Sequence, residues 1–112
     1  MTRPVAGSYR VTECGLPADH YARSEQHRLY GVVSAPEITP AAMQLWGFVP
    51  HARWPRCGDV LPVFVDSDDP SRLRVRWERV ARRDWRNDAH RYTRPARRNA
   101  EQLAAEMRKQ RR

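Results

Sequence analysis

The chain has 112 residues, 21 Lys and Arg against 13 Asp and Glu, and a formal net charge of +8. This length is typical of one domain, and no apolar run approaches the about 20 residues of a membrane-spanning helix. The N-terminus lacks the apolar stretch of a secretory signal, so we expect a cytoplasmic protein. The two cysteines, Cys14 and Cys57, fit no zinc-binding spacing and are expected to be reduced thiols.

The positive charge is concentrated toward the C-terminal end of the sequence. Residues 1–20 carry no net charge, residues 21–80 carry +1 and residues 81–112 carry +7. A basic tail beside a nearly neutral body is a common layout for an interaction segment. What the charge implies about partners therefore applies first to the tail.

The first third of the sequence predicts one clear strand. Residues 1–25 show no clear periodicity and are predicted to form an irregular arm, with one short strand near Tyr9–Thr12 as an option. Residues 28–34 are rich in β-branched and aromatic side chains, which predicts a strand. The two prolines of segment 35–40 exclude a regular helix there.

The segment 42–49 fits either a strand or a short helix. Its apolar side chains share one face of a strand, but the Thr39-Pro40 pair resembles a helix N-cap followed by proline. We predict a strand. Residues 50–59 are predicted as a loop and Val60–Asp66 as the next strand, in which Pro62 indicates a sheet edge or a bulge.

Residues 72–78 are the clearest predicted strand. Apolar and charged residues alternate strictly, which is typical of a strand with one buried and one solvated face. The apolar positions are Leu73, Val75 and Trp77. The outward positions include three arginines about 6.6–6.8 Å apart, a spacing that could follow a phosphate backbone: Arg72, Arg74 and Arg76. Pairing with acids on a neighbouring strand is the alternative for this face.

Two helical patterns follow. The first covers residues 81–92, and Thr93–Pro95 interrupts it. The second covers residues 96–112, in which an apolar stripe recurs at helical spacing. The stripe consists of Ala100, Leu103, Ala104 and Met107. Such a stripe could dock on a partner protein.

Short strands separated by turns rich in Gly, Pro and Asp predict a mainly β fold. We expect a small antiparallel barrel or sheet, OB- or SH3-like by analogy, with a basic α-helical C-terminal extension. The chain then divides into an irregular N-terminal arm (1–25), a small β-barrel domain (26–80) and the basic helical extension (81–112).

The middle of the chain contains a recognisable pattern. It reads Trp54-Pro55, Gly58, Leu61-Pro62-Val63, Val65-Asp66, Asp69-Pro70, Arg72-Leu73 and Trp77. This resembles a WPxxGxxLPVxVDxxDPxRLxxxW pattern in uncharacterised small actinobacterial β-module proteins, and the resemblance covers roughly residues 37–80. It implies a shared β module and no particular reaction. Cys57 and Ser67 replace a proline and an arginine of the pattern, which argues against shared thiol chemistry.

The pattern also has a physical reading as scaffold. Gly58 gives the chain access to positive φ where it turns into a strand. Asp66 and the Asp69-Pro70 pair favour a tight turn through side-chain hydrogen bonds and the fixed φ of proline. No catalysis is needed to explain these residues.

No arrangement of catalytic or metal-binding residues is recognisable. Asp66, Asp68 and Asp69 lack the twelve-residue loop of an EF-hand and predict a turn. The four histidines do not pair at a metal-binding spacing. His51 and Cys57 lie six positions apart on a loop with nothing to orient a base. We predict no enzyme activity, no metal and no cofactor.

The basic tail provides most of the predicted binding residues. Its arginines are interleaved with aromatic residues that could stack on bases. Together with the outward arginines of 72–78, the predicted nucleic-acid-binding set is Arg72, Arg74, Arg76, Arg82, Arg83, Trp85, Arg86, Arg91, Arg94, Arg97 and Arg98. Trp46, Trp54 and Trp77 are expected in the core, and Trp54, between Arg53 and Arg56, is the one to test for stacking.

These residues predict a non-enzymatic binding module. Its cationic C-terminal extension would contact an anionic polymer, with nucleic acid as the first candidate. The alternative is a structural or adaptor protein that docks a protein partner through the amphipathic C-terminal helix. A membrane surface is disfavoured as a partner, because the helix has alanines where larger apolar side chains would be needed.

Overall fold

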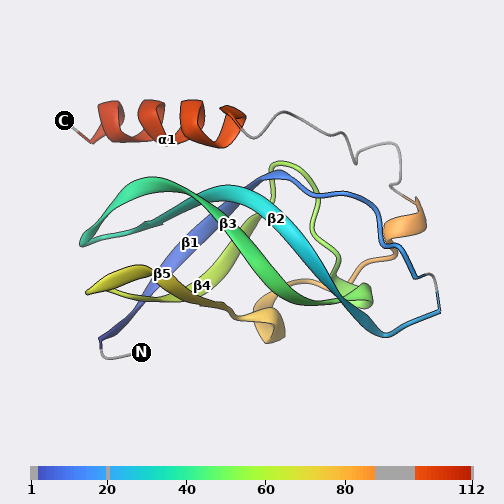
Figure 1. The fold of residues 1–112 in the computed structure, drawn as a ribbon. Coiled ribbons are helices and arrows are strands. Elements are labelled where there is room, and N and C mark those ends of the chain that lie inside the picture. The colour runs from blue at the N-terminus through green and yellow to red at the C-terminus, as the bar shows by residue number, and fades with distance from the viewer. Residues whose placement is uncertain (1–2, 20, 88–97, 112) are drawn as a thin grey trace.

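The computed structural model describes residues 3–19, 21–87 and 98–111, and shows one antiparallel sheet with a helix packed on it (Figure 1). The strands are β1 (Pro4–Glu13), β2 (Ser24–Ala35), β3 (Ile38–Pro50), β4 (Val60–Asp66) and β5 (Asp69–Val75). Between and after them lie the 3-10 turns η1 (His51–Arg53) and η2 (Trp77–Arg79), followed later by the helix α1 (Arg98–Gln110). The prediction of a mainly β fold is confirmed.

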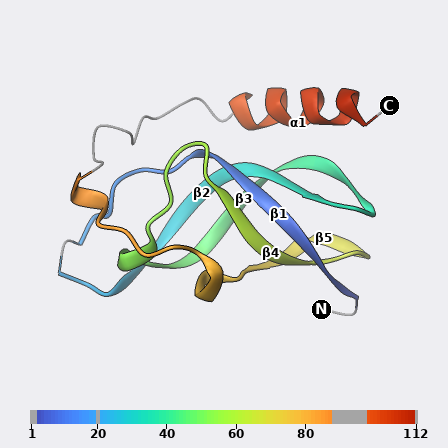
Figure 2. The same ribbon diagram turned by 180° about the vertical axis from the view of Figure 1, so that it is seen from behind.

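The five strands follow the order β3-β2-β1-β4-β5, and every neighbouring pair is antiparallel. β3 and β5 are therefore the two edges, and within the described chain the sheet does not close on itself. Figure 2 shows β1 and β4 crossing the middle of the sheet, with β5 beyond β4.

The prediction of an irregular arm over residues 1–25 is wrong for Pro4–Glu13, which forms the strand β1 and contains the optional short strand near Tyr9–Thr12. β1 is the central strand, paired with β2 on one side and β4 on the other. Its inward positions alternate as Val5, Gly7, Tyr9 and Val11. Gly7 interrupts this apolar pattern because a side chain does not fit there: a Cβ would lie 2.6 Å from the Ser34 carbonyl oxygen.

The other predicted strands are present with small changes. Residues 28–34 and 42–49 lie within β2 and β3, and the predicted strand Val60–Asp66 is β4. The strand predicted over 72–78 ends at Val75, because the chain turns at Arg76 into η2.

The expectation that Pro62 marks a sheet edge or a bulge is wrong, because Pro62 lies in β4, which has a neighbouring strand on each side. Pro62 pairs with Ser8 of β1, while the pairing of β4 with β5 begins only at Val63. On the β5 side the Pro62 carbonyl accepts a hydrogen bond from the Arg76 N–H at 2.8 Å. A proline is tolerated because it stands where the β4–β5 ladder ends.

The turn residues of the central pattern behave as their chemistry predicts. Gly58 has φ +93°, in the left-handed region that favours glycine. The carboxylate of Asp66 is buried and accepts a hydrogen bond from the Asp68 N–H at 2.9 Å, which fixes the turn between β4 and β5.

The core lies on the inner face of the sheet, and Tyr9 is at its centre. Its side chain is fully buried, and its hydroxyl donates to the Met43 carbonyl at 2.6 Å. The ring passes over Gly31, where an added Cβ would lie 2.9 Å from two ring carbons. Burial raises the pKa of Tyr9 above its usual range, and the electrostatic effect of nearby Cys14 is the next largest cause in the same direction. The hydroxyl is therefore neutral and acts as the donor.

The helix α1 packs on the outer face of the sheet (Figure 1). Ala100 and Ala104 are buried against Val32, and Leu103 and Met107 are partly buried beside them. The apolar stripe proposed for a protein partner is therefore covered by the protein's own sheet.

The end of α1 is held by charged hydrogen bonds to the end of β2 and the start of β3. Arg108 donates to the Pro40 carbonyl at 2.9 Å. Arg111 donates to the carbonyls of Ile38 and Ala35 at 3.0 and 2.9 Å. These two guanidinium groups stabilise the docking of the helix.

Candidate functional site

The structure divides the predicted nucleic-acid-binding residues into two groups. Arg72, Arg74 and Arg76 belong to β5 and the residue after it. A second group follows η2 and lines a pocket, namely Arg82, Arg83, Trp85 and Arg86. Arg91, Arg94, Arg97 and the side chain of Arg98 lie outside the described residues, as does the helix predicted over 81–92 from residue 88 onward.

The described part of that predicted helix is not α-helical. Residues 81–84 have no regular structure, and residues 85–87 form a 3-10 turn. The Asp84 carboxylate accepts a hydrogen bond from the Arg86 N–H at 3.0 Å, and the Asp84 carbonyl accepts one from Asn87 at 3.2 Å. Asp84 thus stabilises a local turn that competes with a helix.

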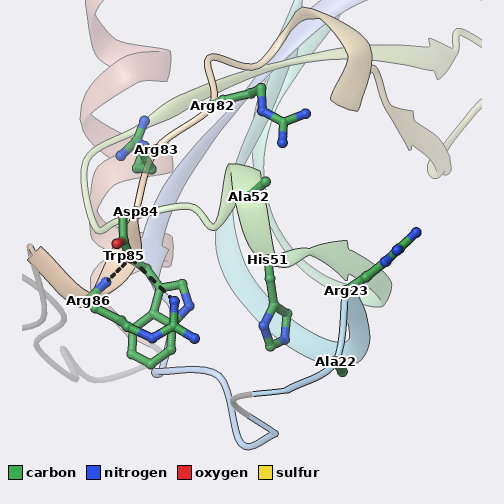
Figure 3. A pocket seen from close by; sticks show the side chains of 9 residues that line it. All are labelled: Ala22, Arg23, His51, Ala52, Arg82, Arg83, Asp84, Trp85 and Arg86. Atoms are coloured by element: carbon green, nitrogen blue, oxygen red, sulfur yellow. Dashed lines mark hydrogen bonds and ion pairs between the residues drawn. The ribbon is translucent and has the colours of Figure 1, made fainter.

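We call the pocket lined by the second group the cationic pocket (Figure 3). It has a volume of about 580 Å³ and is formed by Ala22, Arg23, His51, Ala52, Arg82, Arg83, Asp84, Trp85 and Arg86. Three chain segments meet here: the residues before β2, η1, and the segment after η2.

Backbone hydrogen bonds hold these three segments together. The His51 N–H donates to the Arg23 carbonyl at 2.8 Å, and the Arg83 N–H donates to the Ala52 carbonyl at 2.7 Å. The Arg53 side chain donates to the Val80 carbonyl. The pocket is therefore a product of tertiary contacts and belongs to no single element.

The arginines of the pocket differ in how far they are engaged. Arg83 forms an ion pair with Asp59 at 2.9 Å and points away from His51 in Figure 3. Arg86 lies with its guanidinium carbon 4.9 Å from the centre of the Trp85 ring and near Asp84. Arg23 and Arg82 are exposed and form no ion pair among the described residues. Two guanidinium groups thus remain available to an anion.

His51 forms the inner wall of the pocket. Its side chain is only 9% exposed, and its Nε2 lies 2.9 Å from a carboxylate oxygen of Glu25. Its Nδ1 is buried with no hydrogen-bond partner in the described part of the chain. Trp85 is also buried, and its ring lines the same pocket (Figure 3). The pocket thus combines exposed cations with a buried, partly aromatic wall.

Behind His51 lies a buried aromatic cluster. Trp54 is fully buried, its ring centre 4.9 Å from that of His27 and 5.4 Å from that of His51. Its Nε1 donates to the Gly15 carbonyl at 2.9 Å. Trp54 is therefore a core residue, in agreement with the expectation that it packs in the core, and cannot stack on a ligand in this conformation.

Two titratable groups beside this cluster have shifted pKa values. Burial tends to raise the pKa of Glu25, but hydrogen bonds from the Asp19 and Ala18 N–H groups and from His51 outweigh it and lower the pKa. Burial lowers the pKa of His27, against the opposing effect of Glu25. Both groups favour the deprotonated state in the folded protein.

We expect the protein to become less stable as the pH is lowered from 8 to 4. Below about pH 6.5 the unfolded chain protonates His27 before the folded protein does, and below about pH 4.5 the same holds for Glu25. Urea unfolding at a series of pH values measures this loss. His27→Gln should flatten the dependence between pH 7 and 5, and an unchanged dependence would contradict the assignment.

The β5 arginines are partly engaged with other side chains. Arg72 lies 3.5 Å from the Asp69 carboxylate. The guanidinium carbons of Arg74 and Arg76 lie 5.8 and 4.4 Å from the centre of the Phe64 ring, and Arg76 also lies 3.7 Å from Glu78. Asp69 lies on β5 itself and Glu78 lies in η2, so among the described residues these arginines form no ion pair with an acid of the neighbouring strand β4. The contact that β4 supplies is the Phe64 ring.

The remaining sequence expectations concern the cysteines, metal ligands and membrane-spanning helices. Cys57 is exposed and its thiol donates to the Thr12 carbonyl at 3.1 Å, whereas His51 Nε2 is hydrogen-bonded to Glu25. Both cysteines are free thiols. The described residues contain no cluster of ligands that could hold a metal ion, and no described helix has the length and apolarity needed to cross a membrane.

Sequence reasoning missed Arg23, His51 and Ala52 as members of the pocket. Nothing near Arg23 in the sequence sets it apart from the other arginines.

Comparisons with protein-family models, curated proteins and solved structures found no match to this chain.

Proposed function

We propose that this chain is a non-enzymatic module that binds an anionic polymer, nucleic acid, through the cationic pocket and the basic segment that continues from it. The observation that carries the proposal is the pair Arg23 and Arg82, two exposed guanidinium groups without acidic partners among the described residues, at the mouth of a pocket. Guanidinium groups of this kind suit the oxygens of phosphate groups.

The charge distribution supports the same function. The cationic pocket contains the first residues of the segment 81–112, which carries +7 of the net charge of +8. In this proposal the sheet acts as a small, barrel-like scaffold with an open seam, OB- or SH3-like by analogy. The free thiols Cys14 and Cys57 agree with action in the cytoplasm.

The proposal is tested with the double variant Arg23→Gln/Arg82→Gln. We expect it to bind a fluorescein-labelled single-stranded 20-mer at least about tenfold more weakly than the wild type at low salt. The slope of log affinity against log salt concentration should become shallower by about 0.7 for each phosphate that the variant no longer neutralises. Fluorescence anisotropy at several salt concentrations measures both quantities.

The matched control is Arg3→Gln/Arg10→Gln, which removes the same charge from exposed positions outside the pocket. If both double variants weaken binding equally, the pocket has no special role and only the total charge matters. If the wild type does not bind the oligonucleotide at low salt, the proposed function is wrong.

A further inference from the structure

A second surface lies where the two edges of the sheet face each other. A groove of about 310 Å³ runs between β3 and β5 and is lined by side chains of both strands, among them Trp46, Phe48 and Arg74. We call it the seam groove. It exists because β3 and β5 are not paired with each other.

Two large aromatic side chains are exposed beside the seam groove. Trp46 is 55% exposed and Phe48 is 64% exposed, and both lie on the outer face of β3, two positions apart. The helix α1 covers the same face farther along the strand, at Ala42, and leaves these two rings uncovered. Adjacent exposed aromatic rings on an edge strand indicate a binding surface more strongly than single exposed apolar residues do.

The charges around these rings favour an anionic ligand. The guanidinium carbon of Arg28 lies 5.5 Å from the centre of the Trp46 ring, and Arg74 of β5 lines the same groove as Trp46 and Phe48. The described residues that line the groove include Arg74 and His27 but no carboxylate. Flat aromatic faces beside guanidinium groups match a polymer that presents unpaired bases along a phosphate backbone.

We propose that Trp46 and Phe48, with the arginines beside them, form a stacking platform for the bases of single-stranded nucleic acid. This proposal rests on the function proposed above and narrows its ligand to a single strand. Duplexes present their phosphates but keep their base faces stacked, so they can bind the cationic pocket without using the platform. The two surfaces thus contribute different parts of the recognition.

The test compares the binding of a 15-nucleotide oligothymidylate with that of a 15-base-pair duplex. Trp46→Ala and Phe48→Ala should each weaken binding of the single strand about tenfold, in line with the loss of one base-aromatic stack. Binding of the duplex should stay within twofold of the wild type. The salt dependence should not change, because neither side chain contacts a phosphate.

Tyr21→Ala is the matched control, since Tyr21 is 99% exposed and does not line the seam groove. It should leave the affinity for both oligonucleotides unchanged. A second readout is tryptophan fluorescence. Trp46 is more exposed than the other three tryptophans, so quenching by oligothymidylate should be largely lost in Trp46→Phe. Circular dichroism verifies that each variant is folded.

The outcomes separate the two proposals. If the wild type binds neither oligonucleotide, both proposals are wrong. If Arg23→Gln/Arg82→Gln weakens binding but Trp46→Ala and Phe48→Ala do not, the function stands and the platform is overturned; the seam groove would then suit an extended protein segment pairing with β3 or β5. Equal losses for single strand and duplex would overturn the preference for unpaired bases.

Discussion

The Gly31→Ala variant is expected to lose about 3 kcal/mol or more of its free energy of unfolding, a large part of the total for a domain of this size. Gly31 lies on β2 between Val11 of β1 and Met43 of β3. An added Cβ would lie 2.3 Å from the Arg10 carbonyl oxygen and 2.9 Å from the Tyr9 ring. Neither neighbour can yield easily, since one is backbone in the central strand and the other is fully buried.

Urea unfolding followed by circular dichroism measures the change at Gly31. The matched control is Gly47→Ala on β3, where an added Cβ meets no atom within 4 Å. This control should be neutral or stabilise the strand by about 0.5–1 kcal/mol. Equal stabilities of the two variants would show that β1 and β2 can separate at this point at no cost.

Trp54→Ala should destabilise the protein by about 3–5 kcal/mol. The substitution removes the largest fully buried side chain, leaves a cavity beside His27 and His51, and removes the shorter of two hydrogen bonds to the Gly15 carbonyl, whose other donor is the Cys14 thiol at 3.4 Å. Loss of this support should also disturb the wall of the cationic pocket. Thermal and urea unfolding measure the effect on stability.

Trp46→Ala is the comparison for Trp54, because it removes the same side chain from a half-exposed position. Its cost should stay within about 0.5 kcal/mol. If Trp54→Ala instead has the stability of the wild type but binds oligonucleotide more weakly, the hypothesis that Trp54 stacks on a ligand is restored.

The two tryptophans show where sequence reasoning reaches its limit. Arginines flank Trp54 in the sequence, whereas Trp46 stands in an apolar strand. The structure confirms the core position expected for Trp54, but Trp46 is 55% exposed, so the expectation that Trp46 lies in the core is wrong. Neighbours in a loop say little about burial, and which face of an edge strand is covered depends on where α1 docks.

The strands show what the sequence does determine. Both ends of the strand Val60–Asp66 were predictable to the residue, because apolar side chains recur at every second position and turn residues stand on both sides. The sequence indicates only the Tyr9–Thr12 part of β1, because Gly7 and Ser8 weaken the apolar alternation before it, although Val5, Tyr9 and Val11 keep the period of a strand. A glycine required by a close backbone approach looks in the sequence like a turn signal.

The candidate site was predictable only in its contiguous part. Arg82, Arg83, Trp85 and Arg86 stand together in the sequence, and they do line one pocket. Arg23 and His51 join them through backbone hydrogen bonds between segments about 30 positions apart. The C-terminal stripe was predictable as helical, but only the structure shows that Val32 and Ala42 occupy it.

The central position of β1 has a consequence for the order of folding. β2 with β3 and β4 with β5 are hairpins whose strands meet across short turns, so each can form from local contacts. In the described sheet β1 joins the two hairpins, and its residue Arg10 pairs with Val60 of β4, 50 positions farther along the chain. Closing so long a loop is slow compared with forming a hairpin. The rate-limiting step should therefore be the meeting of two preformed hairpins, and a ribosome must release residues beyond β5 before the sheet can be completed.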